Sequence, residues 1–184
     1  MALTGIQNDN EFFSQHYLSE VFSKDITDTL NQWREQQTDP VKAIGELRQQ
    51  TLRGLEACQD RLKPEQRLEL TRKLYSPLLS ALGYKTDLHR QQLDADLELP
   101  RIAALNDASG QPLLWVYEVL PAGEELADPL LEPLHHCQLT GLPAETGSSV
   151  PTELSKDNWQ TLLAKQVLTQ AKPPRWVLLC HPAQ

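Results

Sequence analysis

A short, almost entirely apolar stretch near the middle of the chain limits the possible folds more than any other segment. Residues 112–120 read PLLWVYEVL, and a polar turn, DASG at 107–110, comes just before them. A run of aromatic and aliphatic residues of this length, bounded by turn formers, predicts a buried β-strand. The residues at 100–107 predict the partner strand of a β-hairpin. The second strand also carries an acid, Glu118, in an otherwise apolar setting.

The first third of the chain is predicted to be helical, because apolar side chains recur there at helical spacing. A first helix follows the capping residues at 8–10 (NDN), and a second, short helix begins near Asp25. A third runs from Pro40 to about residue 62, and a fourth runs from Pro64 to a stop at Gly83. The expected apolar positions are Phe13, Tyr17 and Val21; Ile26, Leu30 and Trp33; Ile44, Leu47, Leu52 and Leu55; and Leu68, Leu70, Leu74, Leu78 and Leu82.

After Tyr84 the pattern becomes strand-like. Residues 85–97 and 100–107 favour strands, and residues 121–156, rich in Pro, Gly, Ser and Glu, favour a loop. A helix capped by Ser155 or Asp157 and an apolar strand at 175–180 complete the chain.

A helix that leads back to the same sheet favours a parallel neighbour. We therefore predict an α/β (α+β) fold with a mixed sheet and the element order α-β-β-β-α-β. We divide the chain into a helical extension, residues 1–62, and an α/β domain, residues 63–184.

Composition restricts the class of protein. Of the 184 residues 40% are apolar and 23% charged, which is typical of a globular chain with its own core. The sequence has no apolar run of the ~20 residues that span a bilayer, and its N-terminus lacks the pattern of a signal peptide. We expect a cytoplasmic protein without membrane contact.

The net charge of −8 argues against a free-standing nucleic-acid-binding protein, which would need a basic surface. The basic residues of the third and fourth helices alternate with acids, so we expect them on a solvated surface. Any attraction to DNA would then come mainly from another part of a larger protein. These basic residues are Arg48, Arg53, Arg61, Lys63, Arg67, Arg72 and Lys73.

The three cysteines, Cys58, Cys137 and Cys180, form no CxxC pair and favour unreactive thiols. His135, His136 and Cys137 have metal-binding side chains, but consecutive strand residues point to opposite faces, so we expect no metal there.

Four aromatic residues could stack on nucleobases, but their apolar surroundings favour a place in the core. They are Trp115, Tyr117, Trp159 and Trp176.

The predicted order and Glu118 together resemble the PD-(D/E)xK nuclease fold. In that fold an Asp on one strand and a D/E-x-K motif on the next hold a divalent metal beside the scissile phosphate, and the lysine helps the attacking water. Here Pro100-Arg101 stands in place of Pro-Asp, and Glu118-Val119-Leu120 in place of Glu-x-Lys. Glu118 matches the pattern, whereas Arg101 and Leu120 depart from it.

Most of the chain is similar to the N-terminal region of type II (IIG-like) restriction-modification proteins, in which a nuclease-like domain precedes an adenine-specific DNA methylase. The similar segments are NDNEFFSQHYLSEVF, LYSPLLSALGY, GQPLLWVYEVL and KPPRWVLLCHPAQ. This resemblance implies a piece of a longer protein, with DNA and a downstream methylase domain as partners. The methylase would use S-adenosylmethionine, and its motifs do not occur in this chain.

The resemblance also implies candidate site residues. If the domain is active, it would use Mg²⁺, with Glu118 as one ligand and Asp94, Asp96 or Asp107 as the second. Asp107 is a further candidate catalytic acid, Glu98 is another nearby acid, and Lys165 on the following helix could assist the reaction.

The two departures favour a catalytically degenerate nuclease-like domain that assists DNA binding or cleavage. In that interpretation Glu118 ends an edge strand and pairs with an arginine or a backbone amide. Two alternatives stay open: an active Mg²⁺-dependent DNA endonuclease with relocated acids, and an acidic protein-interaction module without nucleic-acid contact.

Overall fold

The structure is a computed structural model that describes residues 13–35, 39–59, 62–94, 97–121, 128–135, 137–138 and 157–182. The chain forms two compact units, Met1–Gly45 and Glu46–Gln184. The division falls inside a helix, before the boundary predicted at residues 62 and 63.

The first unit contains one continuous helix where the sequence predicted two. The π-helical turn η2 (Tyr17–Val21) passes directly into α1 (Phe22–Glu35). The prediction of a new helix near Asp25 is wrong, because Asp25 lies inside α1 and its Oδ2 accepts a hydrogen bond from the Tyr17 hydroxyl at 3.2 Å. Helix α2 (Pro40–Gln59) begins as predicted, with Asp39 Oδ1 accepting from the backbone N–H of Val41 at 3.0 Å.

In the second unit the rest of α2 packs on α3 (Pro64–Ala81) through a close approach at Gly54. A Cβ at Gly54 would lie 2.9 Å from Leu74 Cδ1, so a larger residue there requires Leu74 to move. Leu52 is 51% exposed, and Leu82, just beyond the helix, is 47% exposed. The prediction that these two leucines line the core is therefore wrong. The predicted stop is confirmed, since Gly83 has φ of 85°.

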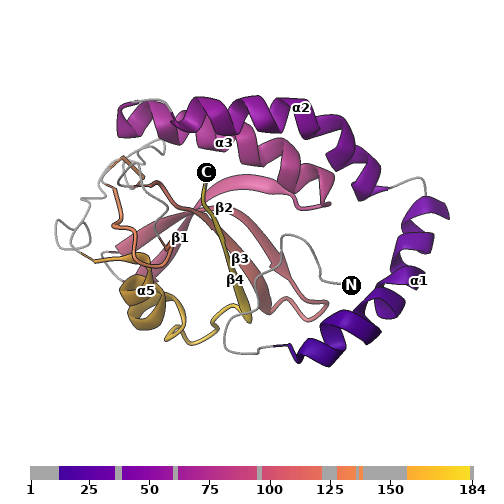
Figure 1. Cartoon of the computed structure of the whole chain (residues 1–184). Helices are drawn as coiled ribbons and strands as arrows, with labels where there is room; N and C mark the ends of the chain where they lie inside the picture. Colours follow the sequence, from indigo (N-terminus) through magenta and orange to yellow (C-terminus); the bar gives the residue numbers. More distant parts are fainter. Residues whose placement is uncertain are drawn as a thin grey trace. The chain divides into compact units, whose positions relative to one another are not determined.

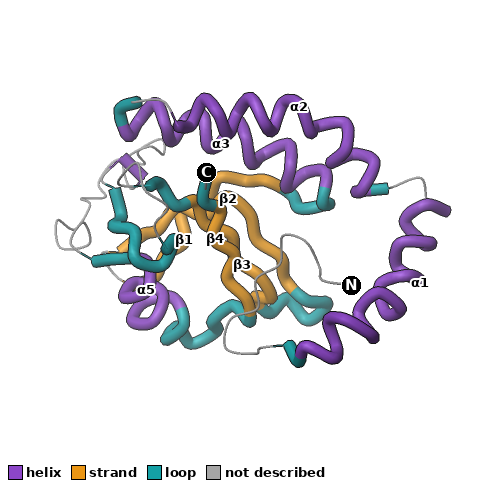
Figure 2. The backbone as a smooth tube through the Cα atoms, in the orientation of Figure 1, coloured by secondary structure: helices purple, strands orange, loops and turns teal. Residues whose placement is uncertain are grey.

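The sheet has four strands in the order β1-β2-β3-β4 (Figures 1 and 2). They are β1 (Thr86–Asp94), β2 (Leu97–Asn106), β3 (Pro112–Glu118) and β4 (Trp176–Cys180). β1 and β2 are antiparallel, as are β2 and β3, whereas β3 and β4 are parallel. The predicted α+β class, the mixed sheet and the order α-β-β-β-α-β are confirmed.

The predicted hairpin turn joins β2 to β3. Asp107 Oδ1 accepts hydrogen bonds from the backbone N–H groups of Ser109 at 2.8 Å and Gln111 at 2.9 Å. Gly110 has φ of 79°, a conformation that side chains with a Cβ rarely adopt. Local turn chemistry therefore sets the pairing of the two strands.

Helices cover both faces of the sheet. On one face Leu79 of α3 packs with Ile102, Val116 and Cys180. On the other, α5 (Trp159–Leu162) and the π-helical turn η4 (Leu163–Val167) pack on Trp115, Tyr117 and Val119. Because successive strand residues point to opposite faces, the apolar run of β3 supplies both cores.

The cap of α5 differs from the prediction. Asn158 Oδ1 accepts from the backbone N–H of Thr161 at 2.9 Å, so Asn158 takes the place expected for Ser155 or Asp157. Ser155 lies outside the described residues.

The predicted burial of Trp115, Tyr117 and Trp159 is confirmed. That of Trp176 is wrong, since it is 46% exposed on β4, which forms an edge among the described strands.

Most of the predicted loop at 121–156 lies outside the described residues. Its described part packs on α5, because the backbone N–H groups of Trp159 and Gln160 donate to the carbonyl oxygens of Glu132 and Leu130. Within the described residues, no helix combines the length and apolar character needed to cross a membrane.

Candidate functional site

The parallel strands bring together the polar residues at their carboxyl ends. Glu118 of β3 is in register with Cys180 of β4, and the backbone N–H of Val119 donates to the Cys180 carbonyl at 2.9 Å. The side chain of Gln138, fully buried, donates to the Glu118 carbonyl at 2.8 Å. This end of a parallel strand pair is where open sheets most often bind ligands, so it is the candidate functional site.

Glu118 forms a bidentate ion pair with Arg72 of α3. Arg72 Nη2 lies 2.5 Å from Glu118 Oε1, and Arg72 Nε lies 2.9 Å from Oε1 and 3.1 Å from Oε2. Glu118 is 2% exposed and the Arg72 side chain 23% exposed. Helix α3 packs on this face of the sheet, so it directs Arg72 at the end of β3.

The electrostatics of the pair follow from its burial. Loss of water around the carboxyl raises the pKa of Glu118, and the hydrogen bonds and charge of Arg72 oppose that rise. The thiol of Cys180 lies in the same buried environment. Burial and the charge of Glu118 together raise the pKa of Cys180 to about 11. Cys180 is therefore protonated at neutral pH and is not a nucleophile.

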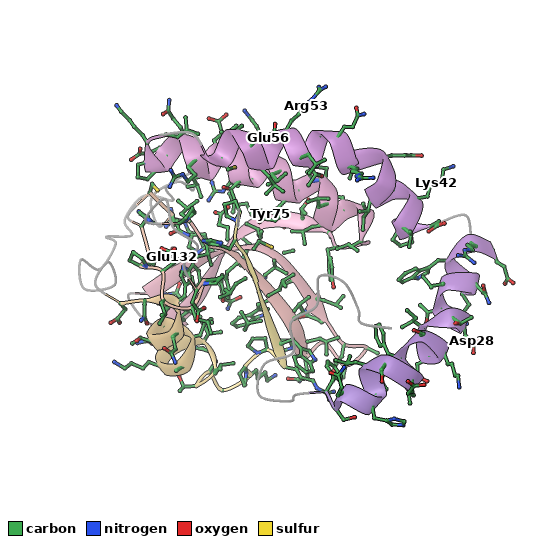
Figure 3. All side chains as sticks on the ribbon, in the orientation of Figure 1. Asp28, Lys42, Arg53, Glu56, Tyr75 and Glu132 are labelled. Carbon is green, nitrogen blue, oxygen red and sulfur yellow. The ribbon has the colours of Figure 1, made fainter. Side chains whose placement is uncertain are left out.

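A second polar group lies beside the first, around Glu132, which Figure 3 labels. Glu132 is 2% exposed, and its Oε1 lies 3.7 Å from His181 Nε2, just after β4. Burial lowers the pKa of His181 and of His135, while the Glu132 charge opposes this in both cases. At neutral pH we expect both imidazoles to be mainly uncharged.

The structure separates Glu118 from the candidate catalytic residues Asp107 and Lys165. Asp107 lies in the hairpin turn at the other end of β3, and a strand of this length spans about 20 Å. Its pKa is lowered by hydrogen bonds from the Ser109 hydroxyl and the Gln111 backbone. Lys165 is exposed on η4, on the face opposite to α3, so the sheet lies between it and Glu118.

The two remaining metal-ligand candidates cannot be placed beside Glu118. Asp96 and the side chain of Asp94 lie outside the described residues. The nearby acid Glu98 pairs with Arg90, whose Nη1 is 3.1 Å from Glu98 Oε2. Among the residues described, no three His, Cys, Asp or Glu side chains gather in a way that could hold a metal ion. The Glu118 carboxylate is already paired with Arg72, and no such group of ligands gathers around it among the described residues, which does not fit a Mg²⁺ site.

The residues that depart from the nuclease pattern take structural positions. The guanidinium of Arg101 lies 5.5 Å from the centre of the Trp115 ring and donates to Gln91 Oε1 at 2.7 Å. Leu120 is 1% exposed and packs with Leu68 and Cys137. Within the cluster at 135–137, His136 lies outside the described residues.

The expectation that Glu118 pairs with an arginine is confirmed, whereas that of an edge strand is wrong, because β3 lies between β2 and β4. Sequence reasoning did not identify Arg72 as that arginine. It was grouped with the basic residues of a solvated surface, and for Arg72 and Arg67 that prediction is wrong. Arg67 Nη1 donates to the Pro121 carbonyl at 2.8 Å, just as Arg72 binds Glu118. The sequence does contain a pattern that places Arg72 on the inner face of its helix. Arg72 lies four residues after the buried Leu68, and residues four apart share a helix face.

Comparisons with known proteins identify no relative of this α+β protein. No family model, no curated protein and no solved structure matches the chain.

Proposed function

We propose that this chain is a catalytically silent, nuclease-like domain that helps a DNA restriction-modification protein hold its DNA. The observation that carries the proposal is the placement of Glu118. It stands at the end of β3, in a chain whose elements follow the order α-β-β-β-α-β, where the fold it resembles presents a metal-binding acid.

The Arg72–Glu118 pair supports catalytic silence. A divalent metal would have to displace a guanidinium that holds both carboxylate oxygens. It would also separate the partly buried Arg72 from the Glu118 carboxylate, which is unfavourable. Arg72 thus supplies the positive charge that an ion would supply in an active nuclease.

A metal titration tests this part of the proposal. We expect Mg²⁺ or Mn²⁺ to change the melting temperature of the wild type and of Glu118→Ala by the same amount, because ligand-linked stabilisation requires a site. Asp87→Ala, which removes an exposed acid on β1, is the matched control. Stabilisation of the wild type that Glu118→Ala alone abolishes would show an active-type metal site and end the claim of silence.

The supporting role in DNA binding is tested by the salt dependence of affinity. A chain of net charge −8 can neutralise only a few phosphates, so we expect weak binding to duplex DNA with a shallow salt slope. Fluorescence anisotropy at about 20 mM and about 200 mM salt measures the slope. We expect no cleavage in the same samples with Mg²⁺ present.

The acidic charge also favours a second candidate, a module that docks a basic protein partner. Absence of DNA binding at the lower salt concentration would exclude the DNA role and leave this candidate.

A further inference from the structure

A hollow of about 160 Å³ lies between α3 and the first two strands of the sheet. Leu79 and Tyr75 of α3 form one side, with Tyr75 labelled in Figure 3. Leu88 of β1 and Ile102 of β2 form the other side. Most of the wall is apolar, as in typical small-molecule sites.

The size of the hollow limits its ligand to one ring. A cavity of about 150 Å³ lined by aliphatic and aromatic side chains holds a benzene molecule, whereas drug-sized ligands need about 300 Å³ or more. The hollow is therefore large enough for a six-membered ring with one or two substituents.

The polar groups of the hollow restrict the ligand further. The hydroxyls of Ser76 on α3 and Thr86 on β1 line the hollow and hydrogen-bond to each other at 3.3 Å. The bonded pair keeps one O–H donor and further acceptor lone pairs, so it suits a ligand group that both donates and accepts, such as a hydroxyl or an amide.

The charge of the hollow is close to neutral. Arg72 lines one side, but its guanidinium is paired with the Glu118 carboxylate. Burial raises the pKa of Tyr75, which keeps this hydroxyl uncharged at neutral pH. A charged ligand would lose its hydration in the hollow and would not gain an opposite charge to pair with. A neutral ligand is therefore favoured.

We propose that this hollow binds a small molecule with one neutral aromatic ring bearing a hydroxyl or amide group. The apolar walls take the ring, and the Ser76 and Thr86 hydroxyls take its polar edge. This site is independent of the DNA role, so either proposal can fail alone.

Phenol is the test ligand, and the full chain is titrated while backbone amide resonances are recorded. We expect saturable shifts at residues 76, 86 and 88, with a dissociation constant of about 1 mM for a ligand of this size. Leu88→Trp puts a larger side chain into the lining of the hollow at a 37% exposed position and should abolish these shifts. Leu105→Trp, at a 44% exposed position on β2 that does not line the hollow, is the matched control and should bind like the wild type.

Two further arms test the ligand chemistry. The double variant Ser76→Ala, Thr86→Val should weaken phenol at least threefold and leave benzene binding unchanged. Benzoate should bind more weakly than phenol.

The proposal is overturned by absence of saturable phenol binding, by equal binding of phenol to Leu88→Trp and the wild type, or by tighter binding of benzoate than of phenol. Equal loss of phenol and benzene in the double variant would also overturn the assigned role of the hydroxyls.

Discussion

Arg72 and Glu118 are 46 residues apart in the sequence, yet three hydrogen bonds join the guanidinium of one to the carboxylate of the other. The pair ties the middle of α3 to the end of β3 beside the parallel strand β4. The proposed loss of catalysis rests on this interaction.

Breaking the pair from one side should be far more harmful than replacing both partners. Arg72→Met leaves a buried carboxylate without its counter-charge, and we expect a loss of about 3–5 kcal/mol in the free energy of unfolding. The double variant Arg72→Met, Glu118→Leu should recover most of that loss, because apolar pairs of similar volume replace buried ion pairs well. Urea unfolding measures all variants, and a double variant as unstable as Arg72→Met would contradict the expectation.

The Arg72→Met variant should also lose stability as the pH rises. Burial raises the pKa of Glu118, and the variant removes the arginine that opposes this rise. A carboxyl with a higher pKa in the folded state binds its proton more tightly when folded. The stabilisation from this proton is fully present below about pH 4.3, the pKa of a glutamate in the unfolded chain. It is lost as the pH rises through the higher pKa of Glu118 in the folded protein. Melting temperatures between about pH 4 and pH 8 should fall more steeply in Arg72→Met than in Arg72→Met, Glu118→Gln. Parallel curves would show that Glu118 does not titrate there.

Acid should destabilise the region around Glu132 through its buried imidazoles. Burial lowers the pKa of His181 and of His135, so the folded state binds their protons less tightly than the unfolded state. Stability is then complete above about pH 6.5, the unfolded value, and decreases as the pH falls through it.

The decrease in melting temperature from about pH 7.5 to about pH 5.5 should be smaller in His181→Gln than in the wild type. His89→Gln, at an exposed position on β1, is the matched control and should keep the wild-type slope. An unchanged slope in His181→Gln would exclude His181 as the titrating group.

The two glycines of α2 should respond oppositely to alanine. A Cβ at Gly45 meets nothing within 4 Å, so Gly45→Ala should stabilise the protein by about 0.5–1 kcal/mol through helix propensity. A Cβ at Gly54 would lie 2.9 Å from Leu74 Cδ1, so the same gain is offset by a shift of a buried side chain. Thermal unfolding of the two variants compares them directly, and equal stabilisation would show that α2 and α3 approach less closely than described.

Local signals account for the elements that sequence reasoning predicted correctly. Asp39 caps α2, Gly83 stops α3, and the residues of the 107–110 turn bond to one another. Each effect acts over a few residues, so the local sequence contains all the information it needs. The same reasoning failed at Asp25, because a residue able to cap a helix can also lie within one when the flanking residues continue it.

Periodicity and turn formers were sufficient to predict the strands, the hairpin and the parallel strand pair, although they divided the first helix into two. The contact between Arg72 and Glu118, and the distance of Asp107 and Lys165 from them, follow from the packing of segments far apart in the sequence. The tertiary structure also decided that Trp176 lies on an exposed edge. The physical reason is distance along the chain. Periodicity and turn chemistry act between near neighbours, whereas an ion pair between residues 46 positions apart exists only after α3 has packed on the sheet.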